Sequence, residues 1–166
     1  MASWRYVLQG MAYAAFITVL GYFSVAPAYR YLPPDKAVIK LAFSHAAERR
    51  VPCRKLSPAE IAELAPNMRK PEACERERLP LLVELEMDGE LIYRAEERPT
   101  GLWKDGASTV YRKFVVAPGK HRVLARLRDS RDAVAFDYEQ DAEVDLAPQQ
   151  NFVIGFRKTT GGFTFQ

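Results

Sequence analysis

The chain has 166 residues, a length that suits one domain with a short appended segment and excludes a large multidomain enzyme. Its net charge of +3 needs no nucleic-acid partner to explain it, and 11% aromatic residues spread along the chain exclude disorder. The charges are distributed unevenly, because no Asp, Glu, Lys, Arg or His lies between Arg5 and Arg30. We therefore expect two parts with different surroundings.

The charge-free part, residues 6–26, is apolar apart from one Gln, one Thr and one Ser. A helix of this length extends about 30 Å, which is the hydrocarbon thickness of a bilayer. Gly10, Ala14 and Thr18 share one face of such a helix at the spacing that allows close packing of membrane helices. We predict a membrane span with a face that contacts a membrane partner.

The span and the following prolines divide the chain into three parts. We predict an N-terminal transmembrane anchor over residues 1–28, a tether over 29–36 and an exported domain over 37–166. A cleaved signal peptide is the alternative, because residues 26–28 read APA, the form of a cleavage site. The apolar stretch exceeds the roughly 7–15 residues usual in signal peptides, which favours an anchor. Either interpretation exports the same domain.

The two cysteines, Cys53 and Cys74, bracket a segment with a strong helix start. Residues 57–60 read SPAE, a capping box with proline in the first turn, and a second proline stops the helix about two turns later. Two cysteines behind an export-type segment favour one disulfide, which we expect to clip this short helix. Unpaired thiols, or a soft-metal site with His45 and Met68, are the alternatives.

From Ala37 onward, apolar and polar residues alternate with period two, which is typical of strands with one solvated face. Asp88-Gly89 predicts a tight hairpin, and Pro118-Gly119 a turn that returns the chain into the next strand. About seven strands suit a mainly β domain, an antiparallel immunoglobulin-like β-sandwich, with an open barrel as the alternative. The expected strands contain residues 39–43, 81–87, 91–95, 110–116, 123–127, 136–146 and 152–156, with a short edge strand at 163–165.

Carboxylates alternate with apolar residues over positions 137–145. Neighbouring carboxylates on one face of a strand lie about 7 Å apart, which is too open for a compact calcium cage. Arg126 and Arg128 offer complementary charges on an earlier strand. We therefore predict charge pairing across a solvated sheet face.

No nucleophile or metalloprotease motif occurs, and His45 and His121 are isolated from other catalytic residue types. We expect no enzyme activity, no catalytic residue, no cofactor and no metal site. The most suggestive loop is residues 97–109, which contains Trp103. Long loops with an aromatic residue are frequent at contact surfaces, so Trp103 either contacts a partner or closes one end of the core.

Three features carry a resemblance. Residues 115–129, VVAPGKHRVLARLRD, look like the proline-glycine and outward-strand unit of PEGA-type surface β-domains. The layout of one span and one sandwich is similar to that of small accessory proteins of bacterial respiratory complexes. Residues 57–80, preceded by Cys53, look like those of uncharacterised proteobacterial single-span membrane proteins of this size. The metal motifs of copper-delivery proteins with such layouts are absent, which argues against a metallochaperone.

The resemblance implies a single-pass protein of the bacterial inner membrane with its C-terminal domain in the periplasm. We expect a non-enzymatic accessory or assembly subunit that binds a larger inner-membrane complex, such as a respiratory one. The expected partners are that complex and the lipid bilayer, and no nucleic acid. Contact would be made through the helix, the β-domain or both. The alternative function is a periplasmic ligand- or metal-binding module.

Overall fold

The computed structural model describes residues 2–26, 32–131 and 134–166. The chain divides into two units, Met1–Pro33 and Pro34–Gln166. The boundary falls within the predicted tether. The possible cleavage motif and the first part of the tether involve residues 27–31, which lie outside the described residues.

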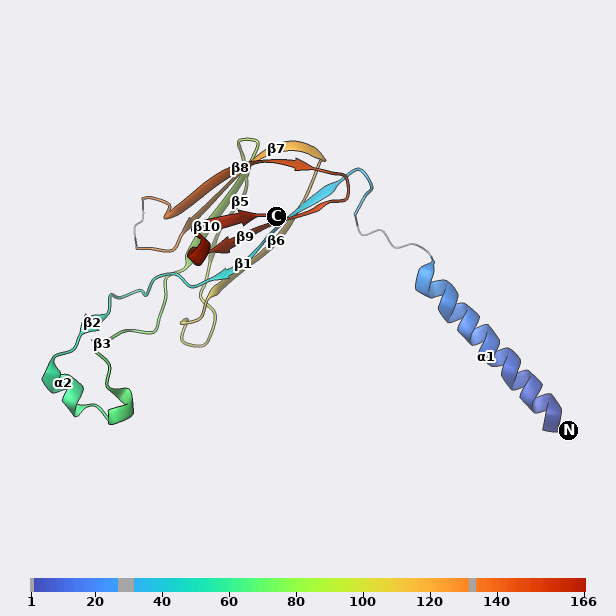
Figure 1. Cartoon of the computed structure of the whole chain (residues 1–166), viewed down its shortest axis with the longest axis horizontal. Helices are drawn as coiled ribbons and strands as arrows, with labels where there is room; N and C mark the ends of the chain where they lie inside the picture. Colours follow the sequence, from blue (N-terminus) through green and yellow to red (C-terminus); the bar gives the residue numbers. More distant parts are fainter. Residues whose placement is uncertain (1, 27–31, 132–133) are drawn as a thin grey trace. The chain divides into compact units, whose positions relative to one another are not determined.

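The first unit contains one helix, α1 (Ala2–Val25) (Figure 1). Its segment Trp4–Val25 is long and apolar enough to cross a membrane, with a mean hydropathy of 1.4. The apolar side chains are exposed on all sides of the helix, so no single stripe marks a core-facing side. This all-round apolar surface is typical of a helix whose surroundings are lipid.

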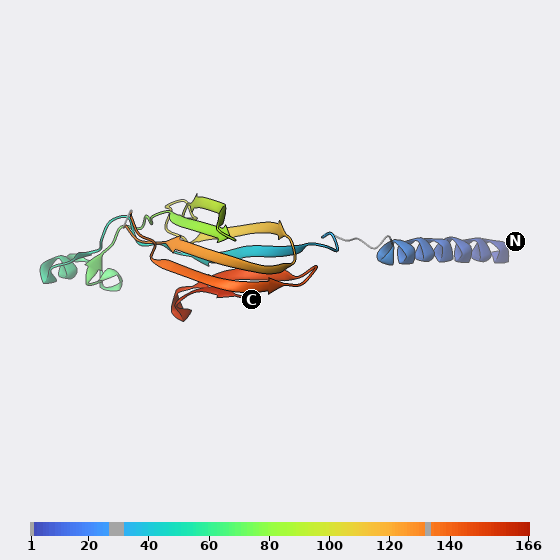
Figure 2. The same cartoon turned by 90° about the horizontal axis from the view of Figure 1, so that it is seen from above.

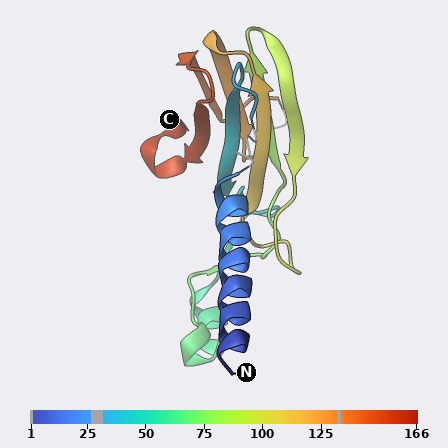
Figure 3. The ribbon, with the colours of Figure 1, turned by 90° about the vertical axis from the view of Figure 1, so that its right-hand side faces the viewer.

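The second unit is mainly β and contains two four-stranded sheets (Figure 1). Its strands run lengthwise along the domain (Figure 2), and β5 and β10 lie on opposite sides of it (Figure 3). The first sheet has the order β10-β9-β1-β6, with β10 (Gly162–Phe165), β9 (Asn151–Arg157), β1 (Ala37–His45) and β6 (Ser108–Val116). The second has the order β5-β4-β7-β8, with β5 (Glu90–Glu97), β4 (Leu81–Met87), β7 (Gly119–Arg128) and β8 (Tyr138–Leu146).

One hydrophobic cluster draws side chains from both sheets. Ile39 and Ile154 of the first sheet and Leu85 and Leu127 of the second are fully buried in it. Burial of one such side chain stabilises the fold by roughly 1.5–3 kcal/mol. The alternation that predicted the strands therefore places their apolar residues in a shared core.

The two predicted turns have different outcomes. The hairpin at Asp88-Gly89 is confirmed, and both residues have positive φ (55° and 84°), as a two-residue turn requires. The turn at Pro118-Gly119 does not return the chain to a neighbouring strand. β6 pairs with β1, whereas β7 pairs with β4 and β8, so the chain crosses between sheets here.

The expected purely antiparallel pairing is also wrong at one place. β1 pairs with β9 in parallel, with Val38 opposite Asn151 and Leu41 opposite Ile154. All other strand pairs in the two large sheets are antiparallel within the described residues. Period-two alternation specifies which face a strand buries, but it does not specify the direction of its neighbour.

Charge pairing across the β7–β8 face is confirmed, and it extends to β4. Arg122 pairs with Asp141 at 2.8 Å, and Arg126 lies 3.6 Å from Glu139. Arg126 also contacts Glu86 and, at 3.2 Å, Glu84. The side chain of Glu84 is only 5% exposed, so this pair is nearly buried although it lies on the outer face.

The segment between β1 and β4 projects from the domain as an arm, which we define as residues 49–78 (Figures 1 and 2). No residue between Glu48 and Pro80 is buried. The Cys53–Cys74 disulfide is confirmed and closes the arm. The arm contains β2 (Arg54–Lys55), α2 (Pro58–Glu63), a 3-10 helix at Pro66–Met68 and β3 (Glu72–Ala73).

Candidate functional site

One end of the β-domain holds a nearly buried charged cluster and a loop with two exposed apolar side chains. The chain enters the domain at Ala37, and the backbone N–H of Gln149 donates to the Lys36 carbonyl at this entry end. The opposite end, which we call the arm end, holds the base of the arm, the loop between β5 and β6, and the chain that follows β7 and β9.

Three charged or polar side chains meet at the arm end where strands finish. His45 at the end of β1 contacts Asp129 after β7, with Nε2 2.6 Å from Oδ2. Lys158 after β9 reaches the same carboxylate oxygen at 3.4 Å. The Asp129 side chain is only 5% exposed, and the His45 ring packs edge-on against Phe156. The nearly buried carboxylate thus has two polar partners, one of them the Lys158 ammonium.

The same residues fix the backbone at the base of the arm. The Asp129 carbonyl accepts from the Glu48 N–H at 2.8 Å, and the Arg78 guanidinium donates to the Ala47 carbonyl at 2.8 Å. Asp137 accepts from the backbone N–H of Asp129 at 2.7 Å. Burial opposes ionisation of Asp137, but hydrogen bonds from the Ser130 side chain and from the backbone N–H groups of Asp129 and Ser130 outweigh it and hold its pKa below the usual value. The cluster is therefore built to position the arm.

The arm keeps its shape without a core. The capping box is confirmed, because the Ser57 hydroxyl accepts from the Glu60 N–H and the Glu60 carboxylate accepts from the Ser57 N–H. Donation by the Ser57 N–H and hydroxyl and by Arg54 lowers the pKa of Glu60 to about 2. The disulfide adds a covalent closure. A two-turn helix with no buried residue needs such support in water.

The arm also contains a candidate ligand set, formed by Cys53, Glu72 and Cys74. Their possible ligand atoms lie within 4.8 Å of one another. Both sulfurs are bonded to each other, so neither carries the thiolate charge that binds a metal. Met68 lies in the 3-10 helix of the arm, and His45 faces Asp129, so the soft-metal set considered from the sequence is not assembled.

The loop between β5 and β6, residues 98–107, is ordered by its own hydrogen bonds. The Gly106 N–H donates to the Thr100 carbonyl at 2.9 Å, and a Cβ at Gly106 would lie 2.9 Å from that same carbonyl oxygen. Trp103 projects from this loop and is 64% exposed, so it does not close the core. Its neighbour Leu102 is 89% exposed. The loop thus presents two adjacent large apolar side chains to solvent.

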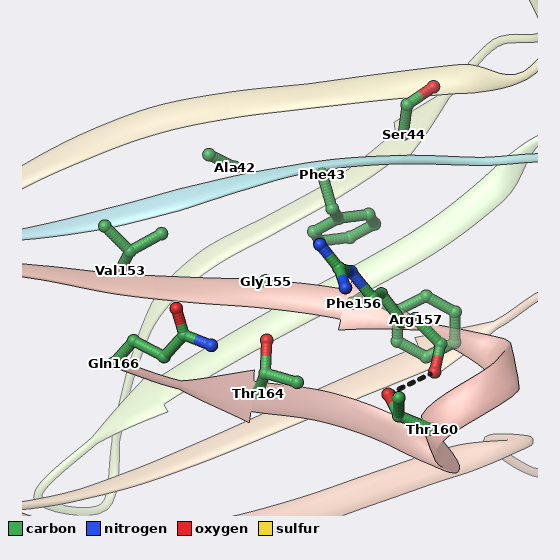
Figure 4. A pocket seen from close by; sticks show the side chains of 10 residues that line it. All are labelled: Ala42, Phe43, Ser44, Val153, Gly155, Phe156, Arg157, Thr160, Thr164 and Gln166. Carbon is green, nitrogen blue, oxygen red and sulfur yellow. Dashed lines mark hydrogen bonds between the residues drawn. The ribbon is translucent and has the colours of Figure 1, made fainter.

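A separate groove of about 540 Å³ lies on the outer face of β1, β9 and β10 (Figure 4). Gly155 forms its floor, where a Cβ would lie 2.8 Å from the Thr164 hydroxyl. The Thr160 hydroxyl donates to the Arg157 carbonyl at its rim. Arg157 is the one ionisable side chain among the ten described lining residues, so the groove offers no acid–base pair.

The predicted partner-contact residues Gly10, Ala14 and Thr18 lie on α1. The Thr18 hydroxyl donates to the Ala14 carbonyl at 2.8 Å, which satisfies it within the helix. A Cβ at Gly10 would meet nothing within 4 Å, so this face is open. α1 and the arm end belong to different units, and the predicted contact residues are therefore divided between them.

Asp129 and Leu102 are the residues that sequence reasoning missed. Asp129 follows a strand whose charged residues all read as a solvated face, and nothing local signals its pairing with His45 across 84 positions. Leu102 could have been found, because two consecutive large apolar residues in a Gly-rich loop are unusual.

Comparison with known proteins assigns the chain to no family. No protein-family model matches the chain, and no curated protein matches it at a significant level.

Proposed function

We propose that this protein is a non-enzymatic accessory subunit, anchored in a bacterial inner membrane by α1, whose periplasmic β-domain binds a larger membrane complex. The observation that carries the proposal is the exposed Leu102–Trp103 pair on an ordered loop beside a clipped, coreless arm. Exposed apolar side chains on rigid loops are costly unless they bind something. The apolar α1 and the open face of its small residues support the membrane part of the proposal.

The compartment is supported by the disulfide. Disulfides persist in oxidising compartments such as the periplasm and are rare in the cytoplasm. The arm depends on the Cys53–Cys74 bond because no residue within it is buried. Export by an N-terminal apolar segment and oxidation of the cysteines are therefore consistent with each other.

The non-enzymatic part rests on how the polar groups of the arm end are used. His45 and Lys158 each contact Asp129, and Asp137 and Arg78 bond to backbone groups. Such contacts position chain segments, and among the described residues of this cluster no nucleophile lies beside an activated base. We propose that this cluster is structural.

We also propose that the two sheets form an immunoglobulin-like sandwich. The support is one hydrophobic cluster shared by two four-stranded sheets. The lateral approach of β10 to β8 supports closure on one side of the two layers. The parallel β1–β9 pair joins the first and last long strands of one sheet.

The association is tested by the mass of the native particle. The full chain is extracted from its own membrane in a mild detergent and examined by native mass spectrometry. A particle heavier than the detergent-bound chain, with a fixed composition across preparations, is expected. A monomer that co-purifies with nothing contradicts the proposal.

The alternative function, metal binding through the cysteine segment, has its own observation in the proximity of Glu72 to both sulfurs. It requires two free thiols. Thiol titration of the denatured protein separates the two functions, since a disulfide yields none and a chelated thiolate site yields two.

A further inference from the structure

The surface at the base of the arm has two adjoining grooves, of about 520 Å³ and 440 Å³. Glu77 and Lys104 line both of them, so the grooves form one continuous surface. The smaller groove contains Leu102 and Trp103, and the larger contains Arg50 and Arg98. We call this the arm-base surface. It combines an apolar site with a cluster of cations.

Two carboxylates of this surface, Glu77 and Asp105, are less exposed than their cationic partners. The Glu77 side chain is 33% exposed and pairs with Arg50, which is 53% exposed, and with Lys104, which is 62% exposed. Asp105 is 29% exposed beneath Arg76, which is 68% exposed. The cations therefore face outward and keep N–H donors directed at solvent. Around Glu77 and Asp105 the outermost charges are therefore cationic.

Arg98 adds an exposed cation to the larger groove, which Glu96 also lines. Within the described ranges it forms no hydrogen bond or ion pair, and it is exposed in the larger groove. Two exposed carboxylates, Glu75 and Glu96, border the grooves. Glu75 lines the Trp103 groove and Glu96 the larger one, so a uniformly anionic surface such as a bilayer meets both carboxylates. A short segment can instead place its carboxylates beside the cations and its apolar side chain beside Trp103.

The surface is also preorganised. The Arg78 N–H donates to the Lys104 carbonyl and its side chain donates to the Asp105 carbonyl, both at 2.9 Å, which fixes the loop to the arm base. A ligand therefore meets Trp103 at little cost in loop ordering. By contrast Tyr111, exposed on β6, is covered by the Lys113 ammonium at 5.6 Å from the ring centroid.

We propose that the arm-base surface binds an acidic segment of a partner protein, with carboxylates toward Arg50, Arg98 and Lys104 and an apolar side chain against Leu102 and Trp103. Tryptophan and arginine are enriched among the hot-spot residues that contribute most of the binding free energy at protein interfaces. This inference rests on the proposed function, since it names the surface and the partner chemistry by which the accessory subunit binds.

The test is photo-cross-linking of the full chain in intact cells. A benzoylphenylalanine residue is placed at position 103 in the arm-base surface, at position 111 on β6 or at position 17 on α1. Adducts are identified by sequencing the cross-linked peptide. We expect position 103, and not 111, to capture one recurrent segment with a net negative charge. Arg98→Glu should reduce the yield about tenfold. The matched control Arg157→Glu reverses an exposed charge in the groove of Figure 4 and should leave the yield unchanged.

The other outcomes are distinguishable. Capture at 111 or 17 but not at 103 overturns the arm-base surface and leaves the accessory function standing. Capture at none of the three positions, together with a monomeric native mass, overturns both. A phospholipid adduct at position 103 contradicts the proposal, because it shows that the arm-base surface contacts the membrane and not a protein segment.

A second measurement covers the case in which residue 103 does not tolerate the probe. In the Trp4→Phe variant Trp103 is the sole tryptophan. The emission maximum of Trp103 in nanodiscs should shift when a synthetic peptide with the captured sequence is added. If no segment is captured, an acidic peptide with one leucine is used in its place. Quenching by brominated phosphatidylglycerol in the nanodisc, without a peptide response, contradicts the proposal.

Discussion

His45 Nε2 lies 2.6 Å from Asp129 Oδ2, which joins the end of β1 to the end of β7 and so connects the two sheets where the arm begins. The carboxylate is nearly buried, and the backbone of the same residue holds Glu48. The pair thus links the core to the base of the arm.

Asp129→Asn removes the charge from this contact while preserving its shape. Because hydrogen bonds to charged groups contribute about 1.5–3 kcal/mol, we expect a loss of stability of that size. Lys158→Met, which removes the more exposed partner, should have a smaller effect. Chemical unfolding of the full chain in detergent, followed by the circular dichroism of the strands, measures both. Equal effects of the two variants would contradict a dominant His45–Asp129 contact.

Arg126 and Arg122 offer a matched pair on the outer face of β7. Arg126 pairs with the buried Glu84, whereas Arg122 pairs with Asp141 where both side chains are more than half exposed. Removal of the sole partner of a buried charge costs about 3 kcal/mol. Glu84 keeps a second partner in Arg94 at 3.0 Å, so Arg126→Ala should cost less than this and still be clearly destabilising. Arg122→Ala should leave the unfolding midpoint unchanged. If the two variants unfold alike, Glu84 is not isolated from solvent as the structure has it.

The disulfide should stabilise the arm and not the core. Cross-linking a loop of this length contributes about 3 kcal/mol in the chain-entropy model. The arm buries no residue, so it can loosen alone when the bond is absent. In the Cys53→Ser/Cys74→Ser variant, hydrogen exchange should accelerate in residues 54–73 and stay slow in β1 and β4. Faster exchange in those core strands would show that the arm is part of the cooperative fold.

His121 gives the entry end a pH dependence. Its Nδ1 lies 2.7 Å from the Asp88 carboxylate and its Nε2 lies 3.0 Å from the Ala117 carbonyl. Both partners only accept, so both ring nitrogens carry protons. Donation to Asp88, in spite of burial, raises the pKa of His121 above 6.5, and the same bond with that from Arg122 N–H lowers the pKa of Asp88 below 3.8.

The stabilisation from His121 is complete below about pH 6.5 and is lost as pH rises through its raised pKa. That from Asp88 is complete above about pH 3.8 and is lost as pH falls through its lowered pKa. The thermal midpoint should therefore decline above pH 6.5 in the wild type and decline less in His121→Gln. Nuclear magnetic resonance titration of the imidazole checks the assignment, and a midpoint at or below 6.5 would refute it.

The sequence predicts locally determined features well. The Asp88-Gly89 hairpin, the Ser57 capping box and the period-two strands depend on neighbours in the chain, and each is confirmed. The cysteine pairing is also confirmed, because only two cysteines are available. These features place most of the core without any knowledge of strand order.

Features that join distant segments could not be predicted. The parallel β1–β9 pair and the crossover from β6 to β7 depend on which strands become neighbours, and alternation is the same for either arrangement. The His45–Asp129 contact depends on both. Trp103 was recognised as a candidate contact residue, but its exposure is decided by the loop that carries it.

The display of the β-domain outside the cytoplasm is the premise of the proposed function, and labelling of one engineered thiol tests it most directly. With Cys53 and Cys74 in the disulfide, Gln166→Cys supplies the single reactive thiol near the C-terminus. We expect a membrane-impermeant maleimide to label it in cells whose outer membrane alone is permeabilised. Labelling only after the inner membrane is opened, with Cys53 and Cys74 reacting as free thiols, would contradict the account.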